Sequence, residues 1–306
     1  MLWAARLPDV VETNAVWGHD AGNLGLRRGR SLETDSDAVA LDPNILEHYA
    51  LGRERDRLYR DGQPGLEFVR TLELLERFLP PAPADVLDVG GGAGAYAHTL
   101  AAGGYRVKLV DPVPLHVEQA REAATGTGHR FEAVLGDARA LAEAERSQDV
   151  VLLMGPLYHL TERAERVLAL REAGRVLRQR GFVFAVGISR YRSLLGGLAA
   201  GVLGEPEFAQ IVATDLATGQ HRNPSKRSDR FTTAYFHEPE ELVEEVREAG
   251  LAAESMLGIE GPGWMFSERW NDASEREGIL QAARLFESKP GLLALSTHIV
   301  VIGRAS

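Results

Sequence analysis

The residues best placed for chemistry in this chain are three closely spaced glycines and the aspartate before them. Gly90, Gly92 and Gly94 follow an apolar run, 85–89, that contains Asp88. Glycines have no Cβ, so the backbone can turn tightly and approach a ligand. A helix that begins just after the turn points its free N–H groups at the same place. This pattern predicts a buried strand that ends in a cradle for a nucleotide-like cofactor.

Two further aspartates close the next two apolar runs. Asp111 follows the run 107–110, where an acidic side chain can grip both ribose hydroxyls, and Asp137 follows the run 131–135. The carboxyl ends of parallel strands meet at one edge of a sheet, so both carboxylates are expected beside the glycine turn.

The glycine spacing alone leaves a second function open. Gly90-x-Gly92-x-x-Ala95 also fits the G-x-G-x-x-G/A fingerprint of dinucleotide-binding proteins. An NAD-dependent oxidoreductase is therefore an alternative, although Asp137 would then have no role. A non-catalytic cofactor-binding or scaffolding module is another.

From about residue 85 to 190 the chain resembles the class I S-adenosylmethionine-dependent methyltransferases. Their first motif reads acidic-x-Gly-x-Gly-x-Gly and is matched by Asp88, Gly90, Gly92 and Gly94. The resemblance implies a doubly wound α/β fold with a seven-stranded, mostly parallel sheet. It implies S-adenosylmethionine as the cofactor, S-adenosylhomocysteine as its product, and methyl transfer to a small-molecule acceptor, at oxygen or nitrogen, as the reaction.

The resemblance also implies roles for single residues. Asp111 would hold the ribose, Pro112 and Val113 would flank the adenine, and Asp137 with the Ala138 N–H would read the adenine edge. Residues after the fourth strand and in the helices before the sheet would meet the methionine end. The cofactor-binding residues expected in this way are Asp88, Gly90, Gly91, Gly92, Asp111, Pro112, Asp137, Ala138, Met154, Gly155, Tyr49 and Arg57.

The acceptor is expected at the end of the fourth strand. Methyl transfer is an in-line displacement, so positioning can supply ~7–11 kcal/mol, whereas a general base typically adds about 3–5 kcal/mol. His159 is the first candidate for a base or acceptor-orienting group, because a near-neutral imidazole can take a proton, and Tyr158 is the second. A histidine packed at the start of a helix is the competing interpretation. Polar and aromatic residues of the later insertions are together expected to line the acceptor pocket, although for each one alone a structural role is the more common interpretation. They are Arg190, Tyr191, His221, Arg222, Tyr235, His237 and Trp264.

Alternating apolar and amphipathic stretches predict the elements that carry these residues. Strands are expected at 85–89, 106–110, 130–135, 149–154, 182–188, 251–259 and 298–302, the last two as an antiparallel pair. Helices at 45–59 and 66–79 precede the sheet. We divide the chain into an extension (1–40), a helical cap (41–84) and a cofactor-binding domain (85–306) with lid insertions at about 189–236 and 260–290.

Composition limits the remaining functions. The net charge is −10 and there is no cysteine, which argues against nucleic-acid substrates and excludes thiolate-held clusters and cysteine nucleophiles. No metal site is expected. The longest small apolar run, 194–203, is too short to cross a bilayer, which needs ~20 residues, so a cytoplasmic protein without a membrane partner is expected. Residues 1–40 are expected to be a mostly irregular extension with one short helix, and an arm over the active site or a homodimer contact is the alternative.

Overall fold

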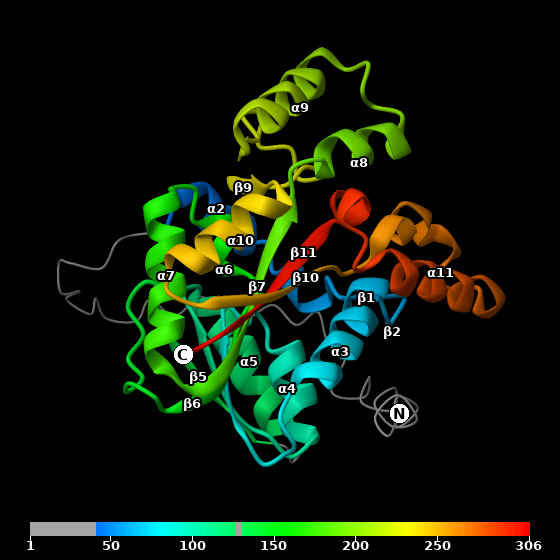
Figure 1. The fold of residues 1–306 in the computed structure, drawn as a ribbon. Helices are drawn as coiled ribbons and strands as arrows, with labels where there is room; N and C mark the ends of the chain where they lie inside the picture. The colour runs from blue at the N-terminus through cyan, green and yellow to red at the C-terminus, as the bar shows by residue number, and fades with distance from the viewer. Residues whose placement is uncertain (1–40, 127–129) are drawn as a thin grey trace, which may run out of the picture.

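The computed structural model describes residues 41–126 and 130–306, so the predicted extension at 1–40 lies outside the described residues. The central sheet has nine strands, and seven of them form its main path in the order β10-β11-β7-β6-β3-β4-β5 (Figure 1). They are β3 (Asp85–Val89), β4 (Arg106–Asp111), β5 (Glu132–Leu135), β6 (Gln148–Leu153), β7 (Leu177–Ser189), β10 (Ala252–Gly258) and β11 (His298–Arg304). All run parallel except β11, which is antiparallel to both neighbours. The predicted fold class is therefore confirmed.

Alternation along the strands explains the two layers of helices. Val86 and Val150 face one apolar cluster, whereas Leu87 and Val151 face the other, because successive side chains of a strand point to opposite faces. Helices α3 (Leu66–Phe78), α4 (Ala95–Ala102) and α5 (Pro114–Gly126) cover the first face, and α7 (Arg163–Val176) and α10 (Pro239–Glu248) cover the second. Within the described residues, no helix is long and apolar enough to span a bilayer.

The segment before α3 differs from the prediction. The single helix expected at 45–59 is wrong: α2 (Pro43–Tyr49) ends early and a 3₁₀ turn, η3 (Arg53–Asp56), follows it. Gly52 separates them with a φ of 70°, a left-handed conformation that interrupts a helix. A small hairpin, β1 (Tyr59–Arg60) and β2 (Gln63–Pro64), then leads into α3.

Two insertions lie around the carboxyl ends of the parallel strands. The first holds α8 (Arg192–Ala200), α9 (Pro206–Thr218) and a hairpin, β8 (Gln220–His221) and β9 (Ala234–His237). Figure 1 shows α8 and α9 beyond the end of β7. The hairpin was not predicted; β9 pairs in parallel with the last two residues of β7. The second insertion holds η4 (Gly261–Arg269), α11 (Ala273–Phe286) and η5 (Pro290–Leu295).

The reversed direction of β11 decides which of its residues reaches the functional edge. His298, the first residue of β11, pairs with Ile188 near the end of β7. The start of β11 therefore lies at the edge where the parallel strands end, beside the insertions.

Candidate active site

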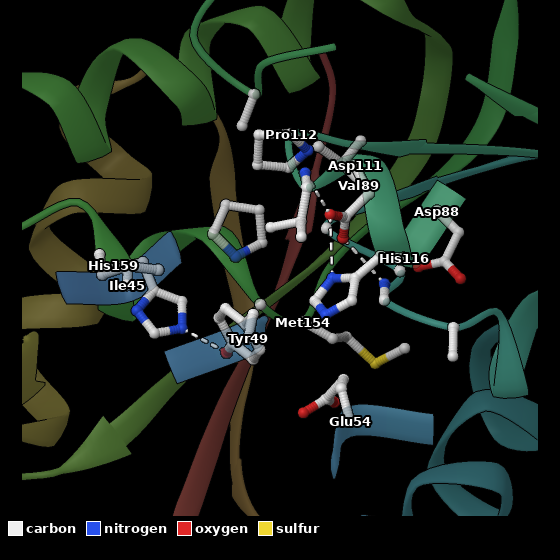
Figure 2. A pocket seen from close by; sticks show the side chains of 18 of the residues that line it. Ile45, Tyr49, Glu54, Asp88, Val89, Asp111, Pro112, His116, Met154 and His159 are labelled. Atoms are coloured by element: carbon white, nitrogen blue, oxygen red, sulfur yellow. Dashed lines mark hydrogen bonds and ion pairs between the residues drawn. The ribbon is translucent and has the colours of Figure 1, made fainter. Parts of the chain in front are cut away.

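One cleft lies over the glycine turn and is called the glycine cleft here (Figure 2). Its walls come from the ends of β3, β4 and β6, from α2 and η3, and from α6 (Pro156–His159). The structure brings all the predicted cofactor-binding residues and both predicted catalytic residues into this cleft: Asp88, Gly90, Gly91, Gly92, Asp111, Pro112, Asp137, Ala138, Met154, Gly155, Tyr49, Arg57, Tyr158 and His159.

The glycine turn cannot carry side chains. Gly90 and Gly92 have φ values of 71° and 57°, a region that other residues avoid. A Cβ on Gly90 would lie 2.6 Å from Cδ of Pro156. The exposed backbone of the turn is therefore available to a ligand in the cleft.

Asp88 lies beneath this turn with only 1% of its surface exposed. A Cβ on Gly91 would lie 2.6 Å from its Oδ2. Burial, with a smaller contribution from the nearby Asp111 carboxylate, raises the pKa of Asp88 to about 7. Asp88 thus supports the turn from below.

Asp111 is fixed by three donors at the end of β4. Its Oδ2 accepts from the Gly92 N–H at 2.9 Å, and its Oδ1 accepts from the Val113 N–H at 2.9 Å. His116 Nδ1 lies 3.1 Å from the same Oδ1. A carboxylate only accepts, so Nδ1 carries the proton and Nε2 of His116 keeps a free lone pair. That Nε2 is buried and has no hydrogen-bond partner among the described residues.

Sequence reasoning missed His116, which lines the cleft and is 2% exposed. The signal was available: a histidine five positions after the strand-ending aspartate lies in the first turn of α5, on the side of the cleft.

The Asp137 carboxylate accepts hydrogen bonds from Arg139 and can still accept another. Arg139 donates to its Oδ1 at 2.9 Å and to its Oδ2 at 2.6 Å, and the Arg139 N–H donates to Oδ1 at 2.8 Å. Glu165 holds the other side of the guanidinium at 2.5 Å. Each carboxylate oxygen has two lone pairs, so Asp137 can still accept a bond from a ligand.

Tyr49 and His159 form a directed pair between α2 and α6. The Tyr49 hydroxyl lies 2.6 Å from Nε2 of His159, and Nδ1 of His159 lies 3.2 Å from the Thr233 carbonyl. The carbonyl can only accept, so Nδ1 carries the proton and Tyr49 donates to Nε2. Burial lowers the pKa of His159 to about 4, so its imidazole is neutral near pH 7.

Arg57 joins the glycine cleft to a second cavity. It donates to Glu54 at 2.8 Å and to both oxygens of Glu67 at 2.8 and 2.7 Å. Glu54 and Arg57 line the glycine cleft, and Arg57 and Glu67 line the second cavity. Sequence reasoning missed both glutamates, because their pairing with Arg57 depends on the turn at Gly52.

The second cavity, called the lid cavity here, measures about 910 Å³ and lies between the two insertions. It shares Tyr49, Arg57, Leu58 and Tyr158 with the glycine cleft. Two of the predicted acceptor residues, His221 and Trp264, line the lid cavity. Arg192 lines it as well, with its guanidinium 4.5 Å from the Trp264 ring.

The other predicted acceptor residues line neither cavity: Arg190, Tyr191, Arg222, Tyr235 and His237. Most of these side chains instead make contacts that hold the fold together. Arg190 donates to Glu241 at 2.6 Å, and His237 lies 3.2 Å from Glu245. Tyr235 stacks under the Arg166 guanidinium at 3.7 Å, while Arg222 donates to the His221 and Ala234 carbonyls.

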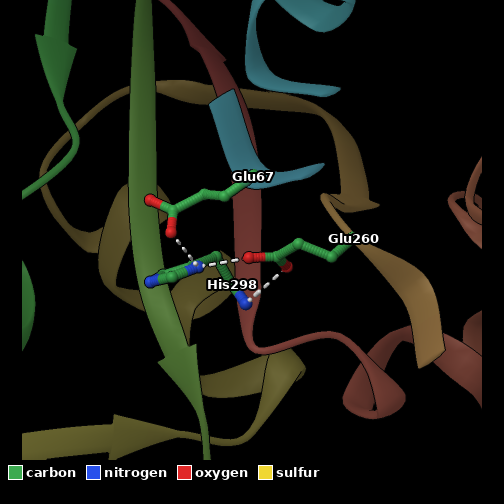
Figure 3. Close-up of side chains that lie close together, drawn as sticks. All are labelled: Glu67, Glu260 and His298. Carbon is green, nitrogen blue, oxygen red and sulfur yellow. Dashed lines mark hydrogen bonds and ion pairs between the residues drawn. The ribbon is translucent and has the colours of Figure 1, made fainter. Parts of the chain in front are cut away.

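Glu67, Glu260 and His298 meet in the wall of the lid cavity (Figure 3). Nδ1 of His298 lies 2.5 Å from Oε1 of Glu260 and 3.8 Å from Oε2 of Glu67. The candidate ligand atoms lie within 4.8 Å of one another, a spacing that a metal ion can use. Arg57 already holds Glu67 and His298 already holds Glu260, so protein groups compensate both carboxylates.

The sequence of this chain is similar to those of known methyltransferases. A sequence profile described as a methyltransferase domain matches residues 86–181. A ubiquinone biosynthesis O-methyltransferase of Methylocella silvestris is 35% identical over 105 residues, which are 34% of this chain and 40% of that protein. The protein of the same name from Xanthomonas axonopodis pv. citri is 28% identical over 217 residues, 70% of this chain and 81% of the relative.

The fold is also found among solved structures. An S-adenosylmethionine-dependent methyltransferase of Methanosarcina mazei superimposes with a TM-score of 0.52 at 16% identity. The superposition covers 76% of this chain and 96% of that protein. At this identity the likeness concerns the fold alone.

Proposed function

Since this chain is a class I S-adenosylmethionine-dependent methyltransferase, we propose that it methylates a small molecule bound in the lid cavity. One observation carries the proposal: the lid cavity adjoins the glycine cleft and shares four lining residues with it, Tyr49, Arg57, Leu58 and Tyr158. A cavity of about 910 Å³ has the size of small-molecule pockets, which run from about 300 to 1,000 Å³.

The residues of the glycine cleft fit the cofactor. Gly90, Gly91 and Gly92 line the cleft with backbone atoms alone, and His116 offers a buried, unpaired acceptor to a hydroxyl. Asp111 and His116 would bind the ribose, Asp137 and Ala138 the adenine edge, and Met154 and Gly155 the methionine part. When bound, S-adenosylmethionine supplies an electrophilic methyl group on a positively charged sulfur.

The chain's own contribution is then positioning. Tyr49, Arg57 and Tyr158 belong to both cavities, so they would border the acceptor atom and the methyl group together. Tyr49 is held by His159 at 2.6 Å, which assigns His159 the role of orienting Tyr49. Holding two reactants in line can supply ~7–11 kcal/mol of the barrier. The names of the relatives support oxygen as the methylated atom.

Calorimetric titration tests the cofactor site. We expect the wild type to bind S-adenosylmethionine and S-adenosylhomocysteine but not NADH. Asp111→Ala should weaken binding at least tenfold, because it removes the acceptor of Gly92, Val113 and His116. Glu132→Ala, in the same sheet but exposed, is the matched control and should bind like the wild type. Equal affinity in both variants would contradict the ribose assignment.

A methyl-donor consumption assay tests the acceptor class. The panel holds small phenols, alcohols, amines and a short peptide, each supplied with S-adenosylmethionine. The proposal expects turnover with small hydroxyl or amine compounds. Turnover of the peptide alone, or no turnover by a protein that binds the cofactor, would contradict a small-molecule acceptor.

A further inference from the structure

We propose that His298, held by Glu260, is the general base that takes the proton from the acceptor, and that the acceptor atom is a hydroxyl oxygen. The proposal rests on the function proposed above and adds the group that removes the proton. His298 lies in the wall of the lid cavity, and its ring centre is 6.4 Å from that of Tyr158, which belongs to both cavities.

The geometry of the pair fixes the proton on one nitrogen of His298. Nδ1 lies 2.5 Å from Oε1 of Glu260, and the backbone N–H of His298 donates to Oε2 of the same carboxylate at 3.0 Å. Both carboxylate oxygens of Glu260 thus accept from His298, and the Glu260 residue is 2% exposed. Because the carboxylate accepts, Nδ1 carries the proton and Nε2 keeps the basic lone pair. A carboxylate behind an imidazole is the arrangement that supports histidine bases in hydrolases.

Among the described residues, the second ring nitrogen of His298 is left unpaired in a residue that lines the lid cavity. Figure 3 shows Nε2 of His298 on the side of the ring away from Glu260. No hydrogen bond joins Nε2 to any residue of the described ranges 41–126 and 130–306, and the side chain is 11% exposed. A hydroxyl in the lid cavity can therefore reach it.

Three other histidines beside the cavities are less suited to the role. His116 lines the glycine cleft but not the lid cavity, and its free Nε2 is assigned to the ribose. His159 already accepts from Tyr49 on its Nε2. His221 is also held by a carboxylate, Asp215, at 2.9 Å. Its Nε2, however, is buried without access to solvent, and its ring stacks on Phe236 with the centres 4.6 Å apart. Of these four histidines, His298 alone offers the lid cavity a nitrogen that is both accessible and unpaired within the described part of the chain.

Charges around the ring set the pH at which His298 acts. Burial acts to lower the pKa of His298, but the Glu67 and Glu260 carboxylates outweigh it, so the pKa lies above its ordinary value. Arg57 opposes this rise from the side of Glu67. Arg192 and Tyr158 also face the cavity near the ring. Only the neutral imidazole accepts a proton, so turnover should increase as the pH rises through this pKa.

The proton and charge balance is simple. The acceptor O–H bond breaks and its proton goes to Nε2 of His298, while the oxygen forms a bond to the methyl carbon and the carbon–sulfur bond breaks. The positive charge of the sulfonium thus appears on the imidazolium, beside the Glu260 carboxylate. The imidazolium then releases the proton to solvent through the lid cavity.

The kinetic test uses His298→Asn, whose amide can still donate to Glu260. With a phenol that the wild type methylates, kcat should fall by a factor of about 10²–10⁴ while the cofactor affinity stays unchanged. The rise of kcat with pH should disappear, and added imidazole should restore part of the activity. Glu260→Gln should shift the rise to lower pH. A wild-type pH profile in His298→Asn would overturn the proposal while leaving the proposed function intact.

His237→Asn is the matched control. His237 also pairs with a buried glutamate, Glu245 at 3.2 Å, but it lines neither cavity. This variant should lower the unfolding temperature and keep the pH profile of the wild type. If both variants change kcat equally, the effect of His298 is structural and the proposal fails. Turnover of amines but of no hydroxyl compound would also overturn it.

A second measurement needs no acceptor. Diethyl pyrocarbonate modifies neutral, accessible imidazole nitrogens, and peptide mass mapping locates the modification. His298 should react at pH 8 and more slowly at pH 6, whereas buried His237 should stay unmodified at both. Resistance of His298 at pH 8 would overturn the proposal whatever the acceptor is. Loss of turnover on adding a chelator would instead assign the Glu67–Glu260–His298 cluster to a metal ion and also overturn it.

Discussion

At the residue scale, the glycine turn is built over a carboxylate that resists ionisation. Asp88 is 1% exposed and lies against Gly91. Ionising it requires a charge in a buried place beside a second carboxylate, Asp111, which explains its raised pKa. The neutral carboxylic acid occupies the buried space under the turn at a lower cost in free energy than the ionised carboxylate would.

The burial of Asp88 makes the free energy of unfolding depend on pH. The pKa of Asp88 is about 7 in the folded protein against an ordinary 3.8, so the folded state binds the proton more tightly. The stability that this proton contributes is complete below about pH 4 and is lost as the pH rises to about 7. The difference of about three pKa units sets an upper limit of about 4 kcal/mol on the contribution of this proton to the free energy of unfolding.

We therefore expect Asp88→Asn to unfold at higher urea concentration than the wild type at pH 8, and the gain should shrink at pH 5. Urea denaturation of the cofactor-free protein at the two pH values measures this. Asp149→Asn is a control at an aspartate that is half-buried and paired with Arg178. A gain for Asp88→Asn that is equal at both pH values would contradict the raised pKa.

How well single residues can be predicted depends on whether the backbone alone places them. The cofactor side followed from strand ends: Asp111 and Asp137 reach the glycine cleft because parallel strands end at one edge. On the lid side, His221 and Trp264 line the lid cavity but the other five predicted residues do not, because a loop arginine or tyrosine can pair in many ways. Arg190, for example, pairs with Glu241, a partner that no spacing in the sequence indicates.

At the scale of elements, a buried ionic network joins α7, α10 and β9. Arg166, on α7, donates to both oxygens of Glu245 at 2.7 to 3.1 Å, and Glu245 also lies 3.2 Å from His237. Arg166 is 2% exposed and Glu245 is fully buried. His237 ends β9, so the network anchors the hairpin of the first insertion to the helices beneath it.

We expect Arg166→Met to lower the free energy of unfolding by about 3–5 kcal/mol, since it leaves the Glu245 charge buried without its main partner. Urea denaturation near pH 7 measures the change. The double variant Arg166→Met, Glu245→Leu should recover part of the loss, because no unpaired charge remains. If the double variant loses as much unfolding free energy as the two single variants together, or more, buried charge is not the cause.

The elements themselves were largely predictable, and the failures have local causes. Apolar alternation located every strand of the main sheet within a few residues. The helix expected at 45–59 failed at Gly52, whose φ of 70° no apolar pattern reveals. The hairpin of β8 and β9 was missed because its strands are only two and four residues long, and its pairing with β7 is a tertiary contact.

At the scale of the whole molecule, α2 and η3 close the glycine cleft from outside the sheet. Ile45, Tyr49, Glu54 and Arg57 line the cleft from these two elements. Side-chain contacts rather than sheet pairing hold the segment. They include hydrogen bonds of Tyr49 to His159, Arg57 to Glu67, Arg53 to the Ser228 carbonyl, Lys226 to Glu47, and the Thr232 hydroxyl to the Asn44 carbonyl. A cofactor that fills the cleft must therefore pass or displace this segment.

Hydrogen exchange should detect this segment directly. We expect S-adenosylhomocysteine to slow amide exchange at 43–58 and around the glycine turn, because the ligand adds contacts to residues that line the cleft. Helix α9 (206–218) lines no part of the glycine cleft and serves as the internal control. Protection of α9 without protection of 43–58 would show that the cofactor enters elsewhere.

The place of β11 in the sheet has a consequence for biosynthesis. β7 ends at Ser189, yet the strand that pairs along its open side begins only at His298. A nascent chain that has emerged as far as α9 therefore carries a long apolar strand with an unsatisfied edge, which is an aggregation hazard. Because His298 arrives with β11, the two halves of the active site mature at different times. The donor-binding half can form early, whereas the half that removes the proton waits for the sheet to close.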